Sequence, residues 1–313
     1  MPEFFNDYFL SLLNEIANPQ KRVFVGYLLS AVAIAFLWLC VVEKLSSKTA
    51  VKKIFDKRIW FSRSSIADFK IILINRVIMS AGAATIVSQL TISTILYNLL
   101  HEQTLIQPLA FHAMSAGMVA ILFTAFFFIF DDFSRFFVHR LMHENKFLWR
   151  FHKLHHSAKV MTPLTVFRTH PIEAILFVIR NGLVQAFVIG VSYGFWGNKF
   201  TILSYFGCNV FVMIFNVMGS NLRHSHVHLS YGHWLEGIFI SPYQHQLHHS
   251  IAAEDENCNF GVVLALWDRL GGSLVRGRPV VKLYYGLGGE QHRVNDTKSG
   301  RLKLIKQIYQ KRA

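Results

Sequence analysis

Histidine is the residue type in this chain whose number and spacing point most directly to chemistry. The chain has 16 histidines, and 13 of them lie between His139 and His249. Imidazole binds iron, zinc, copper and nickel, whereas magnesium and calcium prefer oxygen ligands. Because candidate carboxylates are few in this region, the histidines predict a transition-metal site.

The histidines occur in motifs with helical spacing. One run, VHRLMHENKFLWRFHKLHHS, contains HxxxH and HxxHH, and a later run, SPYQHQLHHS, repeats HxxHH. Residues three and four positions apart share a helix face, so each motif is expected to direct two or three imidazoles toward one point. These motifs supply enough ligands for two metal ions: His139, His143, His152, His155, His156, His245, His248 and His249.

Four of the five histidines between the two runs are further candidates, and the fifth, His233, has no cluster partner. His170 stands in RTHPIE, and His224, His226 and His228 stand in NLRHSHVHL. In a helix, His224 and His228 point together and His226 points away. We therefore add His224 and His228 to the expected ligands and assign His170 a supporting catalytic role.

A carboxylate beside the metal ligands is also expected. Metal-bound histidine usually donates its second ring N–H to a carboxylate or a carbonyl. Asp132 lies seven residues before His139, about two helical turns, and so shares its face. Asp132 is the expected acceptor. The alternative is that the charge of Asp132 only marks the end of a membrane helix. Weaker candidates are Glu144, Glu173, Glu236 and Asp255.

The elements that position these motifs are expected to be membrane helices. Apolar residues make up 52% of the chain and charged residues 16%, against about 25% charged in a soluble domain. A helix that crosses a bilayer needs about 20 apolar residues. Five stretches meet this length, roughly residues 23–42, 77–100, 114–130, 174–196 and 200–220.

Charge sets the expected orientation. Residues 44–70 carry eight Lys and Arg, whereas 101–113 carry none, so the positive-inside rule places the first segment in the cytoplasm. Alternation then puts 131–171 and the chain after residue 220 on that same side. The prediction is an all-α integral membrane protein of about five transmembrane helices, with a cytoplasmic helical cap that holds a dinuclear metal site, in a bacterial inner membrane or the endoplasmic reticulum.

Two regions are expected along the chain. Residues 1–138 form an N-terminal membrane region with three transmembrane helices. Residues 139–313 form the catalytic region, with a transmembrane hairpin at 172–220 and a basic C-terminal tail. The net charge of +14 lies in blocks between apolar runs, which favours anionic membrane lipids over nucleic acid. Three cysteines without CxxC spacing argue against a disulfide framework.

From Asp132 to Gly272 the chain resembles the fatty acid hydroxylase superfamily, also called the sterol desaturase family. The resemblance is carried by HRLMH, FHKLHHS, RTHPIE, RHSHV, SPYQHQLHHS and NFGVVLALWDRLGGS. One departure is HSH at 224–226, where many relatives have HSN or HAN. The motifs look closest to the bacterial sterol desaturase-like and alkylglycerol monooxygenase-like branch. The resemblance implies metal ligation by His139, His143, His152, His155, His156, His224, His245, His248 and His249.

The resemblance also implies a reaction class. Two iron ions would use O2 to hydroxylate, desaturate or oxidatively cleave a fatty acyl, sterol or ether lipid, and zinc could occupy the same ligands. No dinucleotide-binding fingerprint is present, so electrons are expected from a partner such as a ferredoxin, rubredoxin or cytochrome. The alternative is a histidine-rich metal transporter or metal-binding membrane protein, which would place histidines within the apolar runs. A metal-dependent hydrolase would need a well-placed general base.

Overall fold

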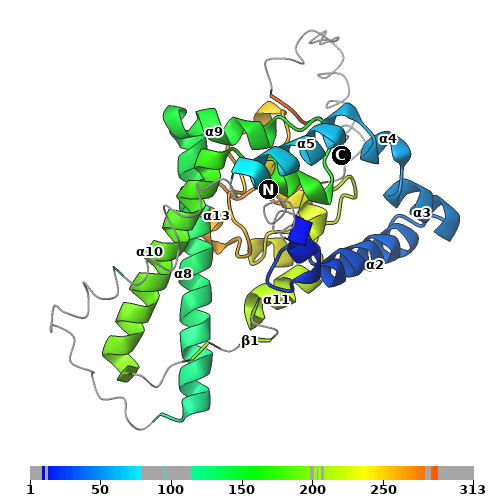
Figure 1. Ribbon diagram of the computed structural model, residues 1–313. Coiled ribbons are helices and arrows are strands. Elements are labelled where there is room, and N and C mark those ends of the chain that lie inside the picture. Colours follow the sequence, from blue (N-terminus) through cyan, green and yellow to red (C-terminus); the bar gives the residue numbers. More distant parts are fainter. Residues whose placement is uncertain are drawn as a thin grey trace.

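The computed structural model describes residues 9–10, 13–78, 95, 114–197, 201–202, 204–205, 208–278 and 283–287. Two long helices stand side by side, and shorter helices gather next to their upper ends (Figure 1). The α-helices are α2 (Val25–Val41), α3 (Ser47–Ile54), α4 (Lys57–Trp60), α5 (Arg63–Ile78), α8 (Ala116–Glu144), α9 (Lys146–His156), α10 (Pro171–Trp196), α11 (Val210–Val217), α12 (Pro242–His248) and α13 (Leu266–Gly271).

Short elements complete the fold. Strands β1 (Ser204–Tyr205) and β2 (Cys208–Asn209) pair antiparallel. The 3-10 helices within the described residues are η2 (Pro163–Phe167), η4 (Ser220–His224), η5 (Leu235–Gly237) and η6 (Ala253–Asp255).

Helix ends follow from capping residues. The Ser115 side chain accepts from Met118 N at the start of α8. Asn145 ends α8 and begins α9, because its side chain accepts from the first backbone N–H groups of α9. At α12, Ser241 and Gln244 form a capping box ahead of the second HxxHH motif.

The helices α8 and α10 are the two described helices that are long and apolar enough to cross a membrane. They contain 29 and 26 residues, or about 43 and 39 Å at 1.5 Å per residue. A buried ion pair joins them, in which Arg180 Nη2 lies 2.8 Å from Asp131 Oδ1. Helix α8 runs without a break through the expected region boundary at 138/139.

None of the other three expected spans coincides with a described helix of 18 or more residues. Helix α2 is apolar but has 17 residues, and it runs across the direction of α8 and α10 (Figure 1). The stretch 200–220, expected as one spanning helix, contains the β1–β2 pair and the eight-residue α11. An eight-residue helix is about 12 Å long, too short to cross a bilayer. The expected span at 77–100 lies almost entirely outside the described residues.

One apolar cluster holds the shorter helices against the histidine-bearing segments. The buried face of α2 packs on α3 and on the segment that follows α11. The members of this cluster are Ala31, Ala35, Leu39, Ala50, Ile54, Leu222, Val227 and Leu229. Their packing places η4, which carries His224, beside α12.

Candidate metal centre

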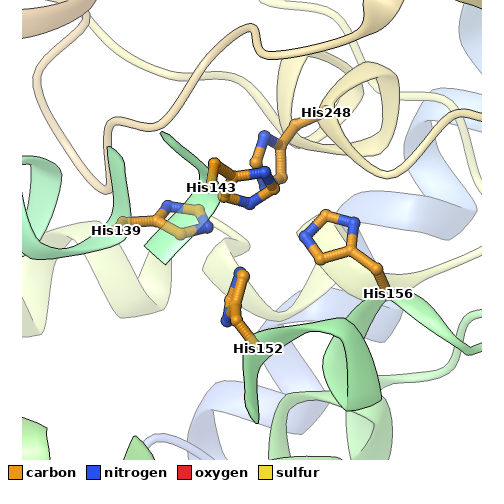
Figure 2. A group of neighbouring side chains, drawn as sticks. All are labelled: His139, His143, His152, His156 and His248. Carbon is orange, nitrogen blue, oxygen red and sulfur yellow. The ribbon is translucent and has the colours of Figure 1, made fainter. Parts of the chain in front are cut away.

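Nine histidines gather into two adjacent groups that have the composition of metal sites. In each group the ring nitrogens offered as ligands all lie within 4.8 Å of one another. The five-histidine group consists of His139, His143, His152, His156 and His248. The four-histidine group consists of His155, His224, His245 and His249. Figure 2 shows the rings of the five-histidine group facing a common centre.

Helical geometry explains which histidine enters which group. His139 and His143 are four residues apart at the end of α8 and point together. In α9, His152 and His156 enter the five-histidine group, whereas His155 enters the four-histidine group. The HxxHH of α12 divides in the same way, with His248 separated from its two neighbours. Each HxxHH motif therefore sends two imidazoles to one group, within the two or three expected, and the third to the other group.

The two groups are in direct contact. The rings of His156 and His249 stack with their centroids 4.4 Å apart. The centroids of His155 and His249 lie 4.7 Å apart. Two metal ions held by these groups would therefore be neighbours.

Hydrogen bonds fix the rings of the five-histidine group from behind. His139 Nδ1 donates to the Phe260 carbonyl at 2.8 Å, and His248 Nδ1 donates to the Cys258 carbonyl at 2.7 Å. His152 Nδ1 donates to Glu173 Oε1 at 3.1 Å. A proton on Nδ1 leaves the Nε2 lone pair free, which is the arrangement that metal-bound histidines usually have.

The free lone pairs provide a test of whether a metal fits. The Nε2 atoms of five ligand candidates are buried and have no hydrogen-bond partner among the described residues: His143, His152, His156, His248 and His249. A buried polar atom without a partner costs about 1–3 kcal/mol. A transition metal accepts these lone pairs, so the residues present fit a resident metal.

The four-histidine group converges through its Nε2 atoms. His224 Nε2 lies 3.1 Å from His155 Nε2 and 3.0 Å from His245 Nε2. Behind His245, Arg223 Nη2 donates to Nδ1 at 3.1 Å, so the neutral ring carries its proton on Nε2, and this proton must leave before Nε2 can bind a metal. His245 is thus oriented by a cation, whereas His139 and His248 are oriented by carbonyls.

Burial favours the neutral form of several of these imidazoles. Burial, together with smaller effects of His152 and Arg223, lowers the pKa of His248 to about 3. Burial also lowers the pKa of His156 and His249 well below the usual value, and neighbouring histidines add to this effect. Neutral imidazole is the form that binds metal, so the site is ready for metal binding at neutral pH.

Asp132 lies close to the site but has a different partner from the one expected. Its carboxylate accepts from Val263 N, Leu264 N and Trp267 Nε1, all at 2.9 Å. The expected bond to His139 is taken by the Phe260 carbonyl. Asp132 therefore fixes the segment that carries this carbonyl.

Three other histidines named from the sequence stand outside both groups. His170 caps α10, and its Nδ1 accepts from Ile172 N at 3.2 Å. His228 Nδ1 donates to Gln246 Oε1 at 2.6 Å, so the structure does not bring this expected ligand to the others. His226 Nε2 donates to the Lys53 carbonyl at 2.8 Å.

Two site residues had little or no signal in the sequence. Glu173 was a weak candidate because 21 residues separate it from His152, and only the turn before α10 brings the two together. Arg223 was not identified at all. Its position directly before His224 was the one available hint.

Comparison with known proteins places this centre in a family. Residues 124–273 match the model of the family described as fatty acid hydroxylase. The matched segment contains Asp132 and all nine histidines of the two groups. This part of the chain is similar to the fatty acid hydroxylase family.

Several curated proteins are similar over the same region. The ornithine lipid hydroxylase of Rhizobium tropici is 31% identical over 142 residues, which cover 45% of this chain and 38% of the relative. The Delta(7)-sterol 5(6)-desaturase of Eremothecium gossypii is 31% identical over 160 residues, covering 50% and 39%. The alkylglycerol monooxygenase of Xenopus tropicalis is 27% identical over 157 residues, covering 50% and 31%.

The similarity thus spans less than half the length of these three relatives. No solved structure matches the chain.

Proposed function

We propose that this protein is a membrane-bound di-iron oxygenase that hydroxylates, desaturates or oxidatively cleaves a lipid. The observation that carries the proposal is the pair of adjoining histidine groups, whose buried Nε2 atoms face one another inside a fatty acid hydroxylase domain. A lipid hydroxylase, a sterol desaturase and an alkylglycerol monooxygenase among the relatives support an oxidative reaction on a lipid.

In this proposal the metal would supply the O2 chemistry and the protein would hold and orient the ligands. Iron bound at the two groups would supply the O2 chemistry that breaks an unactivated C–H bond. The nine imidazoles would hold the ions without adding charge, and zinc could occupy the same ligands. Glu173 and the carbonyls of Cys258 and Phe260 keep the rings in one orientation. Burial of these groups keeps bulk water away from the reacting centre.

The lipid and the electrons come from outside the chain. Helices α8 and α10 would anchor the site at the membrane, with the histidine groups at the cytoplasmic face. The eight basic residues at 44–70 support this side, and an acidic ferredoxin, a rubredoxin or a cytochrome would deliver electrons. The proposal also includes further membrane-crossing segments besides α8 and α10, which would bring the total to about five.

The placement of the histidines disfavours metal transport as the function. A transporter needs ligands along its spanning helices. In α8 the histidines lie in the last turns, at His139 and His143, and α10 contains none. Ligands gathered at one end of the helix pair build a fixed site rather than a path.

Isotope labelling tests the proposal. Lipids from cells with and without the active gene, grown under 18O2, would be compared by mass spectrometry. The expected product is a lipid with one labelled oxygen, or a lipid with one new double bond. Metal flux through reconstituted protein that needs neither oxygen nor an electron donor, without any lipid product, would contradict the proposal.

A further inference from the structure

One segment outside the ligand set bonds directly to the five-histidine group and, through Arg223, is linked to the four-histidine group. Residues 258–264, here called the strap, lie between α12 and α13. Three alternate carbonyls of the strap accept hydrogen bonds from the site. Cys258 O accepts from His248 Nδ1 at 2.7 Å, Phe260 O from His139 Nδ1 at 2.8 Å, and Val262 O from Arg223 Nη1 at 2.8 Å.

Two buried aspartates hold the other side of the strap. Asp268 accepts from Phe260 N at 2.8 Å, from Gly261 N at 2.7 Å and from Ser273 Oγ at 2.6 Å. Asp132 accepts from the backbone N–H groups of Val263 and Leu264. The two carboxylates are 0% and 1% exposed, so four of the five N–H groups from Phe260 to Leu264, all but that of Val262, have fixed acceptors away from water.

The strap approaches Asp268 closely because residue 261 is glycine. A Cβ atom at Gly261 would lie 2.6 Å from Asp268 Oδ2 and 2.9 Å from the Leu264 carbonyl. Contacts this short force the backbone or the carboxylate to move. The hydrogen-bond pattern at Asp268 therefore depends on the absence of a side chain at this position.

Arg223 links the strap to the four-histidine group through hydrogen bonds. Its Nη1 bonds the Val262 carbonyl, and its Nη2 bonds His245 Nδ1. The N–H of the same peptide unit, on Val263, points to Asp132. The peptide dipole thus lies between a buried cation and a buried carboxylate, in the orientation that both favour. Movement of this peptide would move Arg223 and with it the ring of His245.

We propose that the strap sets the ligand geometry of both histidine groups, and that Asp132, Asp268 and Arg223 are positioning residues for metal binding. This inference rests on the proposed function, in that the two groups hold metal. His139 and His248 depend on the strap directly, and His245 depends on it through Arg223. Loss of such outer partners typically weakens metal affinity by about 10–100-fold.

The test measures metal binding by the detergent-purified full-length chain, titrated with Fe²⁺ under anaerobic conditions. The readouts are metal per chain from elemental analysis and affinity from competition with a chelator. The expected parent value is two metals. Gly261→Ala and Asp268→Asn are expected to weaken binding about 10–100-fold. Gly117→Ala is the matched glycine control, because a Cβ at Gly117 meets nothing within 4 Å.

Arg223 gives a selective readout that general destabilisation would not give. Arg223→Met is expected to weaken one of the two metal equivalents at least about 10-fold and to leave the other near the parent value. Arg223→Lys keeps a cation and should recover part of the loss. Val188→Ala, a buried position in α10 away from the site, controls for reduced stability and should keep both metals.

The outcomes separate the two proposals. Unchanged affinity in Gly261→Ala, Asp268→Asn and Arg223→Met, with a parent that binds two metals, would overturn the role of the strap alone. A parent that binds no metal would overturn the proposed function as well. Circular dichroism compares the helical content of the variants with that of the parent. If the strap variants fail to fold, the result for Arg223→Met decides. Equal weakening of both metal-binding steps in that variant would count against the inference.

Discussion

At the residue scale, the sequence predicted which histidines gather together, but not the groups to which they bond. All ten expected ligands except His228 lie in the two groups, because the i, i+3 and i, i+4 spacings are local properties of a helix. The partners are not local. Phe260 is 121 residues from His139, so no pattern near His139 could show that its carbonyl, rather than Asp132, would be the acceptor.

The placement of His228 leads to a matched comparison of two histidines. We expect His248→Ala to lower product formation about 100-fold or more, because it removes a ligand from the five-histidine group. His228→Ala should keep both metals and most activity, since His228 bonds Gln246 instead. Metal per chain and turnover of the purified variants check this. Equal loss in the two variants would mean that His228 is a ligand after all.

Buried neutral histidines also predict how stability depends on pH. The pKa of His248 is about 3 in the folded chain, and those of His156 and His249 also lie well below the unfolded value near 6.5. As pH falls below 6.5, these histidines become protonated in the unfolded chain but stay neutral in the folded chain, so acid favours unfolding. Each such histidine would remove roughly 1 kcal/mol of stability by pH 5.5.

Thermal unfolding of chelator-treated protein between pH 7 and 5.5 measures this effect. We expect Tm to fall steadily across that window. The window ends above the usual range of carboxyl titration, which limits the contribution of ordinary carboxyl groups. A Tm that stays constant or rises on acidification would contradict the assignment of these histidines as buried and neutral.

At the element scale, periodicity predicted the helices but not how they share their side chains. A helix turns 100° per residue, so in HxxHH the first and last histidines lie 40° apart while the middle one lies 60° to the other side. Because of this difference, His155 and His248 each enter a different group from the other two histidines of their motif. Hydropathy alone likewise predicted one helix at 200–220, and could not show that a strand pair would form within residues 204–209.

The contact between α8 and α10 depends on a buried charge pair. Arg180→Met would leave Asp131 without its most buried partner and should destabilise the folded chain by about 3 kcal/mol. The matched control is Arg135→Met, because Arg135 binds the same carboxylate with 39% of its side chain exposed. That change should cost at most about 1 kcal/mol. Unfolding in detergent compares the two variants, and similar losses would show that burial does not distinguish the pairs.

At the scale of the whole molecule, the site is assembled from segments that are distant in the chain and meet at one end of the α8–α10 pair. The histidines come from α8, α9, η4 and α12. Sequence reasoning reached this arrangement only through charge, by placing all histidine motifs on one side of a membrane. Because the ligands must meet, this placement is required by the geometry of the site, whatever the number of membrane segments.

Sidedness gives the last prediction. Ser157, after α9, and Ser250, after α12, both adjoin histidine ligands, whereas Ser115 begins α8 at the opposite end of a helix of 29 residues. That helix is about 43 Å long, more than the roughly 30 Å of bilayer hydrocarbon. With the three native cysteines replaced by alanine, single cysteines at 157 and 250 should react with a membrane-impermeant reagent from the cytoplasmic side only. A cysteine at 115 should react only from the other side. Labelling of 157 and 250 from opposite sides would be incompatible with one centre built from α9 and α12, and labelling of all three from one side would mean that α8 does not cross the membrane.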